Sequence, residues 1–448
     1  MEIVIKLSQF LLSLSLLIIL HELGHFIPAK IFKTRVEKFY LFFDVKFSLL
    51  KKKIGETEYG IGWLPLGGYV KISGMIDESM DKEQMAFPPQ PWEFRSKPAW
   101  QRLIIMLGGV TVNFILAFII YIGMAFSYGD NYIDNNSLKD GVWVTSSVVE
   151  DAGIKTGDQI VSIDGKKVER FVPSVSMDIL TSKALVVRRN GEEKNINMPV
   201  NFIGKFLDSD KKGVITLRMP FVVGGLSETS KNKEVLKPKD IFVSINGISV
   251  KYFDQAAAIL NANKGKKIPV VVVRNQKETP ITVEVNNEGK LGVGLGSLTE
   301  NNLEKLGYYK FSKENYSFME SIPVGIIKGK EQLLGYGKQL KLIFNPDTGA
   351  YKGVGGFAAI YNIFPSHWSW EIFWNITALL SIMLGVMNLL PIPALDGGHV
   401  MFLLYEMISG RKPSDKFLEN AQMVGFFLLI ALLLFANGND IYKAIVGK

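Results

Sequence analysis

Two histidines four residues apart, His21 and His25, enclose Glu22 inside the apolar run from Val4 to Ala29. On a helix, residues four apart lie on one face, so both imidazoles can bind one zinc ion. Glu22 lies beside them and can act as the general base that takes a proton from the attacking water. The alternative is a pair of core histidines that hydrogen-bond to neighbouring carbonyl groups. Ionisable side chains inside a membrane span indicate function by default, so we favour the zinc site.

Two imidazoles leave zinc one protein ligand short, and a candidate lies near the other end of the chain. Asp396 follows the apolar run from Ile372 to Leu390, in a segment where Pro391 and Pro393 interrupt the helical pattern. These prolines free backbone groups that a cavity or a substrate can use. Burial of an unpaired carboxylate is costly, and zinc would offset that cost. The alternative is a turn aspartate at the membrane surface.

Four apolar segments are long enough to cross a bilayer, at about residues 4–29, 100–126, 371–391 and 417–436. Lysine and arginine residues are dense directly after the first segment and directly before the last, which marks that side as cytoplasmic. This topology places His21 and His25 near the cytoplasmic end of the first span, with Asp396 at a similar depth. Because the topology rests on basic residues and not on the motifs, the agreement supports one three-ligand site.

Composition limits the classes of protein that need to be considered. The 448 residues leave room for two to four domains, and an apolar content of 48% indicates membrane spans combined with sizeable water-soluble parts. The chain has no cysteine, so a metal site must use histidine and carboxylate ligands. The net charge of +8 would suit nucleic acid, but we find no nucleic-acid-binding motif, and much of the excess lies beside the spans.

The sequence His-Glu-Leu-Gly-His in a first span, with Asn-Leu-Leu-Pro-Ile-Pro-Ala-Leu-Asp-Gly in a late one, resembles the site-2 protease family of intramembrane zinc metalloproteases. The resemblance runs from end to end and implies one Zn²⁺ per chain, bound by His21, His25 and Asp396. His399 is a rival ligand, since on a helix beginning near Asp396 it would share a face with it. We favour Asp396 because the family motif uses the aspartate. In the family, the residue that matches Asn388 contacts the substrate or the site.

Two further segments are interpreted through this resemblance. Gly67, Gly68 and Tyr69 resemble the family's membrane-reentrant β-loop, whose strand edge could bind an unwound substrate. The alternative is an ordinary cytoplasmic hairpin. Asn113 lies in the second span, where the family pattern has a Gly-Pro pair, two residues and then Asn-Phe. The proline is absent here, so Asn113 either supports the site or bonds between helices.

A repeat lies in the middle of the chain, where residues 157–165 match residues 239–247 without a gap. Each copy is a loop, a strand and a glycine turn, and both resemble PDZ domains, which bind extended peptides as an added strand. The second copy departs from this pattern, since Lys239 replaces Gly157 and Val235 replaces Gly153. The alternative is two unrelated strand-turn units. Both copies follow the second span and are therefore expected outside the cytoplasm.

The expected fold is a four-span α-helical membrane protein with a membrane-associated β-rich loop and two extracytoplasmic PDZ-like α/β domains. A loose helical period over residues 323–344 suits either a membrane-surface helix or a helix packed on a soluble domain. The predicted segments are a first span at 1–30, a cytoplasmic region at 31–99, a second span at 100–127, PDZ-like domains at 128–212 and 213–299, an interfacial linker at 300–370, a third span with the aspartate motif at 371–410, and a fourth span with its tail at 411–448.

The resemblance implies an intramembrane zinc endopeptidase in a bacterial inner membrane, with its active site near the cytoplasmic side and its PDZ-like domains in the periplasm. Its substrates would be pre-trimmed single-pass membrane proteins, such as an anti-sigma factor of the envelope stress response, and remnant signal peptides. The PDZ-like domains would filter substrates by size or bind peptide termini. The alternative is a non-catalytic membrane PDZ scaffold with a structural zinc site. A transporter ranks last, because the four spans show no internal repeat.

Overall fold

The computed structural model describes residues 1–65, 67–75, 87–209 and 213–446, and their contacts divide the chain into two compact units. One unit contains residues 1–130, 315–341 and 352–448. The other contains residues 131–314 and 342–351. The unit that begins at the N-terminus carries every residue of the predicted metal site.

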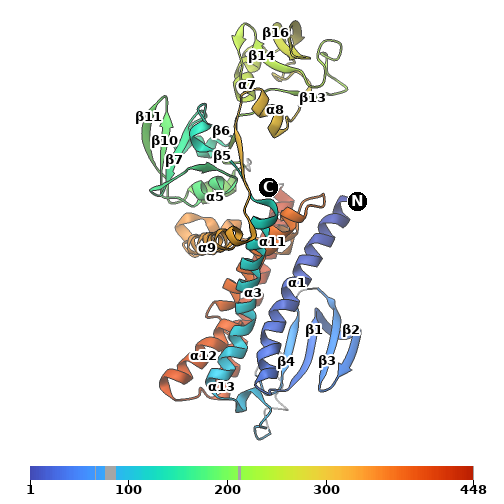
Figure 1. The fold of residues 1–448 in the computed structure, drawn as a ribbon, viewed down its shortest axis with the longest axis vertical. Helices are drawn as coiled ribbons and strands as arrows, with labels where there is room; N and C mark the ends of the chain where they lie inside the picture. Colours follow the sequence, from blue (N-terminus) through green and yellow to red (C-terminus); the bar gives the residue numbers. More distant parts are fainter. Residues whose placement is uncertain (66, 76–86, 210–212, 447–448) are drawn as a thin grey trace. The chain divides into compact units, whose positions relative to one another are not determined.

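Among the described residues, four helices are long and apolar enough to cross a membrane: α1 (Glu2–Ile31), α3 (Ala99–Tyr128), α11 (Trp370–Leu389) and α13 (Asp415–Val446). These match the four predicted spans, so the chain is a membrane protein. Helix α3 is the central one, because it packs against α1, α11 and the shorter α12 (Asp396–Ser409). In Figure 1, α3 and α1 run side by side.

The predicted β-rich region after the first span is a four-stranded sheet. Its strands are β1 (Val36–Leu41), β2 (Phe43–Ile54), β3 (Thr57–Leu64) and β4 (Tyr69–Ile72). The strand order is β2-β3-β1-β4, so β4 is an edge strand. β1 is parallel to β3, and the other neighbouring pairs are antiparallel. Figure 1 shows the sheet beside α1, where β1 and β4 contact the helix.

The other unit contains two copies of one α/β arrangement, each built around a core of its own. The first copy comprises β6 (Val142–Val144), α4 (Ser147–Asp151), β7 (Gln159–Ile163), β8 (Lys166–Lys167), α5 (Ser174–Leu180), β10 (Ala184–Arg189), β11 (Glu192–Asn197), α6 (Phe202–Asp208) and β12 (Ile215–Leu217). The second comprises β13 (Val223–Leu226), β14 (Ile241–Ile245), β15 (Ile248–Ser249), α7 (Phe253–Ala262), β16 (Lys267–Arg274), β17 (Lys277–Glu284) and β18 (Val293–Leu295). A further sheet of this unit has the order β19-β5-β9, from β5 (Asp130–Asp134), β9 (Arg170–Phe171) and β19 (Phe311–Glu314).

The same buried ion pair recurs in both copies. Arg189 binds Asp158 at 2.6 Å in the first copy, and Arg274 binds Asp240 at 2.6 Å in the second. Each arginine also donates to a backbone carbonyl that precedes its aspartate. Lys239 has a φ of 74°, which is left-handed like the φ of 95° at Gly157, the matching residue of the first copy. The backbone turn is therefore the same in both copies although lysine replaces glycine.

The predicted boundary between the copies, at residue 212, is wrong by at least one strand. β12 lies after that boundary but pairs antiparallel with β6 of the first copy, so the first copy extends to Leu217. The predicted boundary falls after α6, the last helix of the first copy, whereas the strand that pairs with β6 is the last element of that copy.

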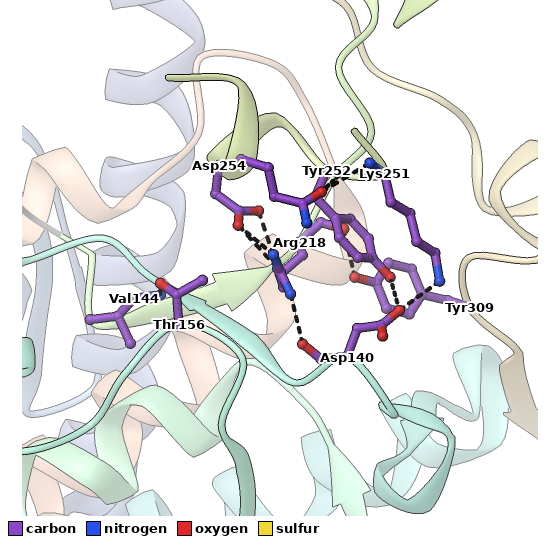
Figure 2. Close-up of polar contacts among 9 residues, drawn as sticks. Asp140, Val144, Thr156, Arg218, Lys251, Tyr252, Asp254 and Tyr309 are labelled. Atoms are coloured by element: carbon purple, nitrogen blue, oxygen red, sulfur yellow. Dashed lines mark hydrogen bonds and ion pairs between the residues drawn. The ribbon is translucent and has the colours of Figure 1, made fainter. Parts of the chain in front are cut away.

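Polar contacts join the copies directly after β12, as Figure 2 shows. Arg218 binds Asp254 at 2.6 Å, and both side chains are largely buried. Tyr252 and Lys251 both donate to Asp140 at 2.6 Å. The hydrogen bonds from Lys251 and Tyr252 hold the pKa of the Asp140 carboxyl below its usual value.

The segment between the repeats and the third span contains α8 (Glu300–Lys305), α9 (Phe318–Ile343) and α10 (Phe357–Ile363). Helix α9 begins five residues before the predicted start, so Pro323 lies inside it. Gly325 and Gly329 of α9 lie against α3. A Cβ added at Gly325 would lie 2.5 Å from Ile122, and a Cβ added at Gly329 would lie 2.5 Å from Phe118. Its Ile326, Ile327 and Leu334 are exposed.

Candidate metal centre

The structure brings His21, His25 and Asp396 together although Asp396 lies more than 370 residues after the histidines. The two Nε2 atoms are 3.3 Å apart, and Asp396 Oδ2 lies 3.4 Å from His21 Nε2 and 3.3 Å from His25 Nε2. Tetrahedral zinc with ligand bonds of about 2.0–2.1 Å separates its ligand atoms by about 3.4 Å. The three atoms therefore form a triangle of the size that zinc requires.

The buried Asp396 Oδ2 atom gives a second indication of a metal ion, because it has no hydrogen-bond partner among the described residues. A buried carboxylate oxygen without a partner is costly, and so are two imidazole nitrogens that face each other without a shared proton. A cation at the centre of the triangle satisfies all three atoms at once. The residues present thus fit zinc.

The far sides of both imidazoles are held by neighbouring groups. His25 Nδ1 lies 2.8 Å from the Ile105 carbonyl oxygen, so Nδ1 carries the proton and Nε2 presents its lone pair to the metal. His21 Nδ1 lies 3.0 Å from the side-chain amide of the fully buried Asn113. The atom that faces His21 Nδ1 is Asn113 Nδ2, so binding of a metal through Nε2, which leaves the proton on Nδ1, requires the Asn113 amide to turn over and present its oxygen. Asn113 therefore lies against the far side of the His21 ring.

A close approach of α1 and α3 gives the histidines their position. At Gly24 an added Cβ would lie 2.4 Å from the Gly108 carbonyl oxygen, so the two backbones touch. At Gly109 an added Cβ would lie 2.3 Å from His25 Nε2. Glycine at these positions lets the α3 backbone pass directly beneath the imidazoles.

Asp396 is the first residue of α12 and follows the proline segment that ends α11. Pro391 and Pro393 lie between the two helices, as predicted. The side-chain amide of Asn388, near the end of α11, lies 3.3 Å from His21 Nε2. Asn388 therefore lies beside the metal-facing side of the ligand triangle.

Glu22 belongs to the ligand helix α1 and lies on the side of it that faces the edge strand β4. The Val70 backbone of β4 hydrogen-bonds to the Glu22 carboxylate. The start of β4 packs against the same turn of α1, since a Cβ on Gly68 would lie 2.4 Å from Ile18 and 3.7 Å from Glu22 Cγ. The proposed base thus lies between the ligands and a strand edge.

The predicted substrate-binding residues of the loop differ in what they contact. Tyr69 turns its side chain into the sheet, where its hydroxyl donates to Asp44 at 2.8 Å and its ring stacks on Tyr40 and Phe43. Gly67 lies against the Phe43 ring, and Gly68 lies against α1. Only the backbone of these residues therefore remains available to a peptide.

The rival ligand His399 lies outside the group of described residues that could hold a metal ion. It lines a separate cavity together with Arg102 and Glu406, which form an ion pair. His367 contributes its backbone carbonyl as an acceptor for Gln9.

Sequence reasoning did not identify the Ile105 carbonyl, Ser381 or Gln422. Ser381 donates to the Asn113 carbonyl oxygen at 2.7 Å and so links α11 to α3 next to the site. Gln422 accepts a hydrogen bond from the segment before Asp396. The available signal was polar residues within otherwise apolar helices, because such residues usually face a partner inside the bundle.

Four spans and a buried His-His-Asp triangle with an adjacent glutamate define a zinc metalloprotease of the membrane. The sequence model of Peptidase family M50 matches residues 9–432. The chain belongs to this family.

The relatives cover almost the whole chain. The regulator of sigma E protease of Haemophilus influenzae is 28% identical over 98% of this chain and 99% of its own length. A relative from Fusobacterium nucleatum, named as a presumed zinc metalloprotease, is 28% identical over 96% of each chain. A similarly named relative from Rickettsia conorii is 26% identical over 96% of this chain and 97% of its own. The predicted resemblance to the site-2 protease family is thus confirmed.

Proposed function

We propose that this protein is an intramembrane zinc endopeptidase that hydrolyses peptide bonds within transmembrane segments of single-pass membrane proteins. The depth of the ligands is the observation that carries this proposal. His21 lies ten residues before the end of α1 at Ile31, which corresponds to about 15 Å along the helix. Since the hydrocarbon core is about 30 Å thick, a site at this depth meets peptide bonds that lie inside the bilayer.

Each residue near the triangle has a defined task in this reaction. Zinc, when bound, polarises the scissile carbonyl and lowers the pKa of water at the site to about 7. The Glu22 carboxylate takes the proton of the attacking water and then transfers it to the leaving amine nitrogen. Asn388 donates its amide N–H to the carbonyl oxygen of the bound peptide as negative charge develops there.

The edge strand β4 supports the binding of an unwound substrate. A transmembrane helix satisfies its peptide groups internally, so its scissile segment must unwind and find other partners. The backbone of residues 67–69 leads into β4, which has no neighbour on its outer side among the described strands. A substrate segment that adds to this edge lies next to Glu22.

The two repeated domains act, in this proposal, as PDZ-like modules on the extracytoplasmic side of a bacterial inner membrane. Basic residues beside the first and fourth spans support this orientation. The domains admit substrates that another protease has already trimmed, or bind the peptide terminus that such trimming creates. In line with the resemblance to the site-2 protease family, we propose an anti-sigma factor and remnant signal peptides as substrates.

Cleavage of a single-span model substrate in detergent tests the proposal. Wild type is compared with Glu22→Gln and with Glu56→Gln, a control at an exposed glutamate in the β2–β3 turn. We expect cleavage by wild type and by the control, and none by Glu22→Gln or after chelation of zinc. Cleavage that survives Glu22→Gln would exclude the mechanism. Absence of wild-type cleavage, with zinc bound, across a panel of trimmed single-span proteins would favour the scaffold with a structural zinc site.

A further inference from the structure

The fourth span, α13, contacts the segment that carries the metal-binding aspartate. Gln422 is only 4% exposed, whereas its neighbours on the helix, Met423 and Val424, are exposed. The Gln422 Oε1 atom accepts a hydrogen bond from the Ala394 backbone N–H at 3.2 Å. One buried side chain of the fourth span is thus directed at the backbone two residues before Asp396.

Gly425, almost one turn further along α13, makes a second contact with the same segment. An added Cβ at Gly425 would lie 1.7 Å from the Pro393 carbonyl oxygen and 2.3 Å from its carbonyl carbon. Both atoms are backbone, so a rotamer change could not relieve the overlap. The α13 backbone therefore lies directly against the chain at Pro393.

The segment between α11 and α12 needs an external support. Ala394 has a φ of 79°, a left-handed conformation that a residue with a Cβ adopts only when its surroundings impose it. The two prolines lack N–H donors, so this segment makes fewer backbone hydrogen bonds than a helix. Asp396 begins α12 directly afterwards, so a change at Ala394 moves the carboxylate.

We propose that Gln422 and Gly425 are positioning residues for the metal centre, which hold residues 393 and 394 so that Asp396 Oδ2 meets both imidazoles. Gln422 fixes the strained Ala394 N–H, and Gly425 sets the distance between α13 and Pro393. The fourth span is then part of the zinc site although it supplies no ligand. This inference rests on the zinc site of the proposed function, but it does not depend on which substrate is cleaved.

The effect is measured first on metal binding in the purified full chain. Zinc affinity is determined by competition with a chelator, and the Co²⁺-substituted protein is examined by its visible absorption, which reports ligand geometry. Gln422→Leu removes the acceptor at similar volume, whereas Gln422→Glu keeps an acceptor oxygen. Asn420→Leu, at an exposed position of the same helix, is the matched control. Gly425→Ala is compared with Gly438→Ala, where an added Cβ meets nothing within 4 Å.

We expect Gln422→Leu and Gly425→Ala to weaken zinc binding about 10- to 100-fold, as for other groups that orient ligands, and to shift the Co²⁺ spectrum. Gln422→Glu and both controls should retain wild-type affinity and spectrum. If Gly425→Ala does not fold, the comparison of Gln422→Leu with Gln422→Glu decides the question. Wild-type affinity and spectrum in Gln422→Leu would overturn the proposal. Zinc binding without cleavage by wild type would refute the proposed function but leave this inference standing.

Discussion

The contact between α1 and α3 at Gly24 allows a quantitative prediction. An added Cβ at Gly24 would lie 2.4 Å from the Gly108 carbonyl oxygen, whereas ordinary contacts begin at 3.4 Å, so Gly24→Ala must separate the two backbones by about 1 Å. Overpacking of this kind costs about 1–3 kcal/mol of stability. Gly24 lies between the two ligands, so the same shift displaces His21 and His25 from Asn113 and Ile105. A displacement of about 1 Å at a catalytic group lowers kcat about 100-fold.

The assay for this prediction is cleavage of a single-span substrate by zinc-loaded protein, together with thermal unfolding in detergent. Gly123→Ala is the control, because it lies on α3 at a position where an added Cβ meets nothing within 4 Å. The control should keep its kcat and lose no stability, since alanine is the better helix former. Gly24→Ala should lose both kcat and stability. Equal behaviour of the two variants would refute the reasoning.

Three further predictions concern support of the ligands and the junction of the repeats. Asn113→Leu should weaken zinc binding about 10- to 100-fold in chelator competition, since His21 loses its orienting partner; unchanged affinity would count against that role. Arg218→Ala leaves Asp254 largely buried without its partner and should lower the local opening free energy by about 3 kcal/mol, measured by hydrogen exchange. The Asp140 carboxyl has a pKa below its usual value, so its contribution is complete above about pH 4 and lost as pH falls through the lower folded value. Asp140→Asn should abolish this acid sensitivity, whereas persistence would assign it to another group.

The ligands could be predicted from sequence because their evidence is local. The spacing of His21 and His25 is a helical repeat, and Asp396 is a carboxylate in an apolar context. Choosing Asp396 over His399 required the family motif, since helical spacing alone leaves both open. Only the folded chain shows that Asp396 Oδ2 completes the triangle.

Other features depend on contacts between distant segments and could not be predicted. The pairing of β12 with β6 joins strands separated by some 70 residues, so the boundary between the repeats was placed too early. Gln422 was not identified from the sequence, because its partner is a backbone N–H in another segment. The glycines of α1 and α3 carry no signal of their own until the crossing point of the helices is known.

The identity of the third ligand tests the account most directly. X-ray absorption at the zinc edge of purified wild type should show nitrogen and oxygen ligands at about 2.0–2.1 Å, with two imidazoles. The Asp396→Ala variant should lose zinc or one oxygen ligand, and His399→Ala should give the wild-type spectrum. A wild-type spectrum from Asp396→Ala, with a changed spectrum from His399→Ala, would contradict the assignment of the metal centre.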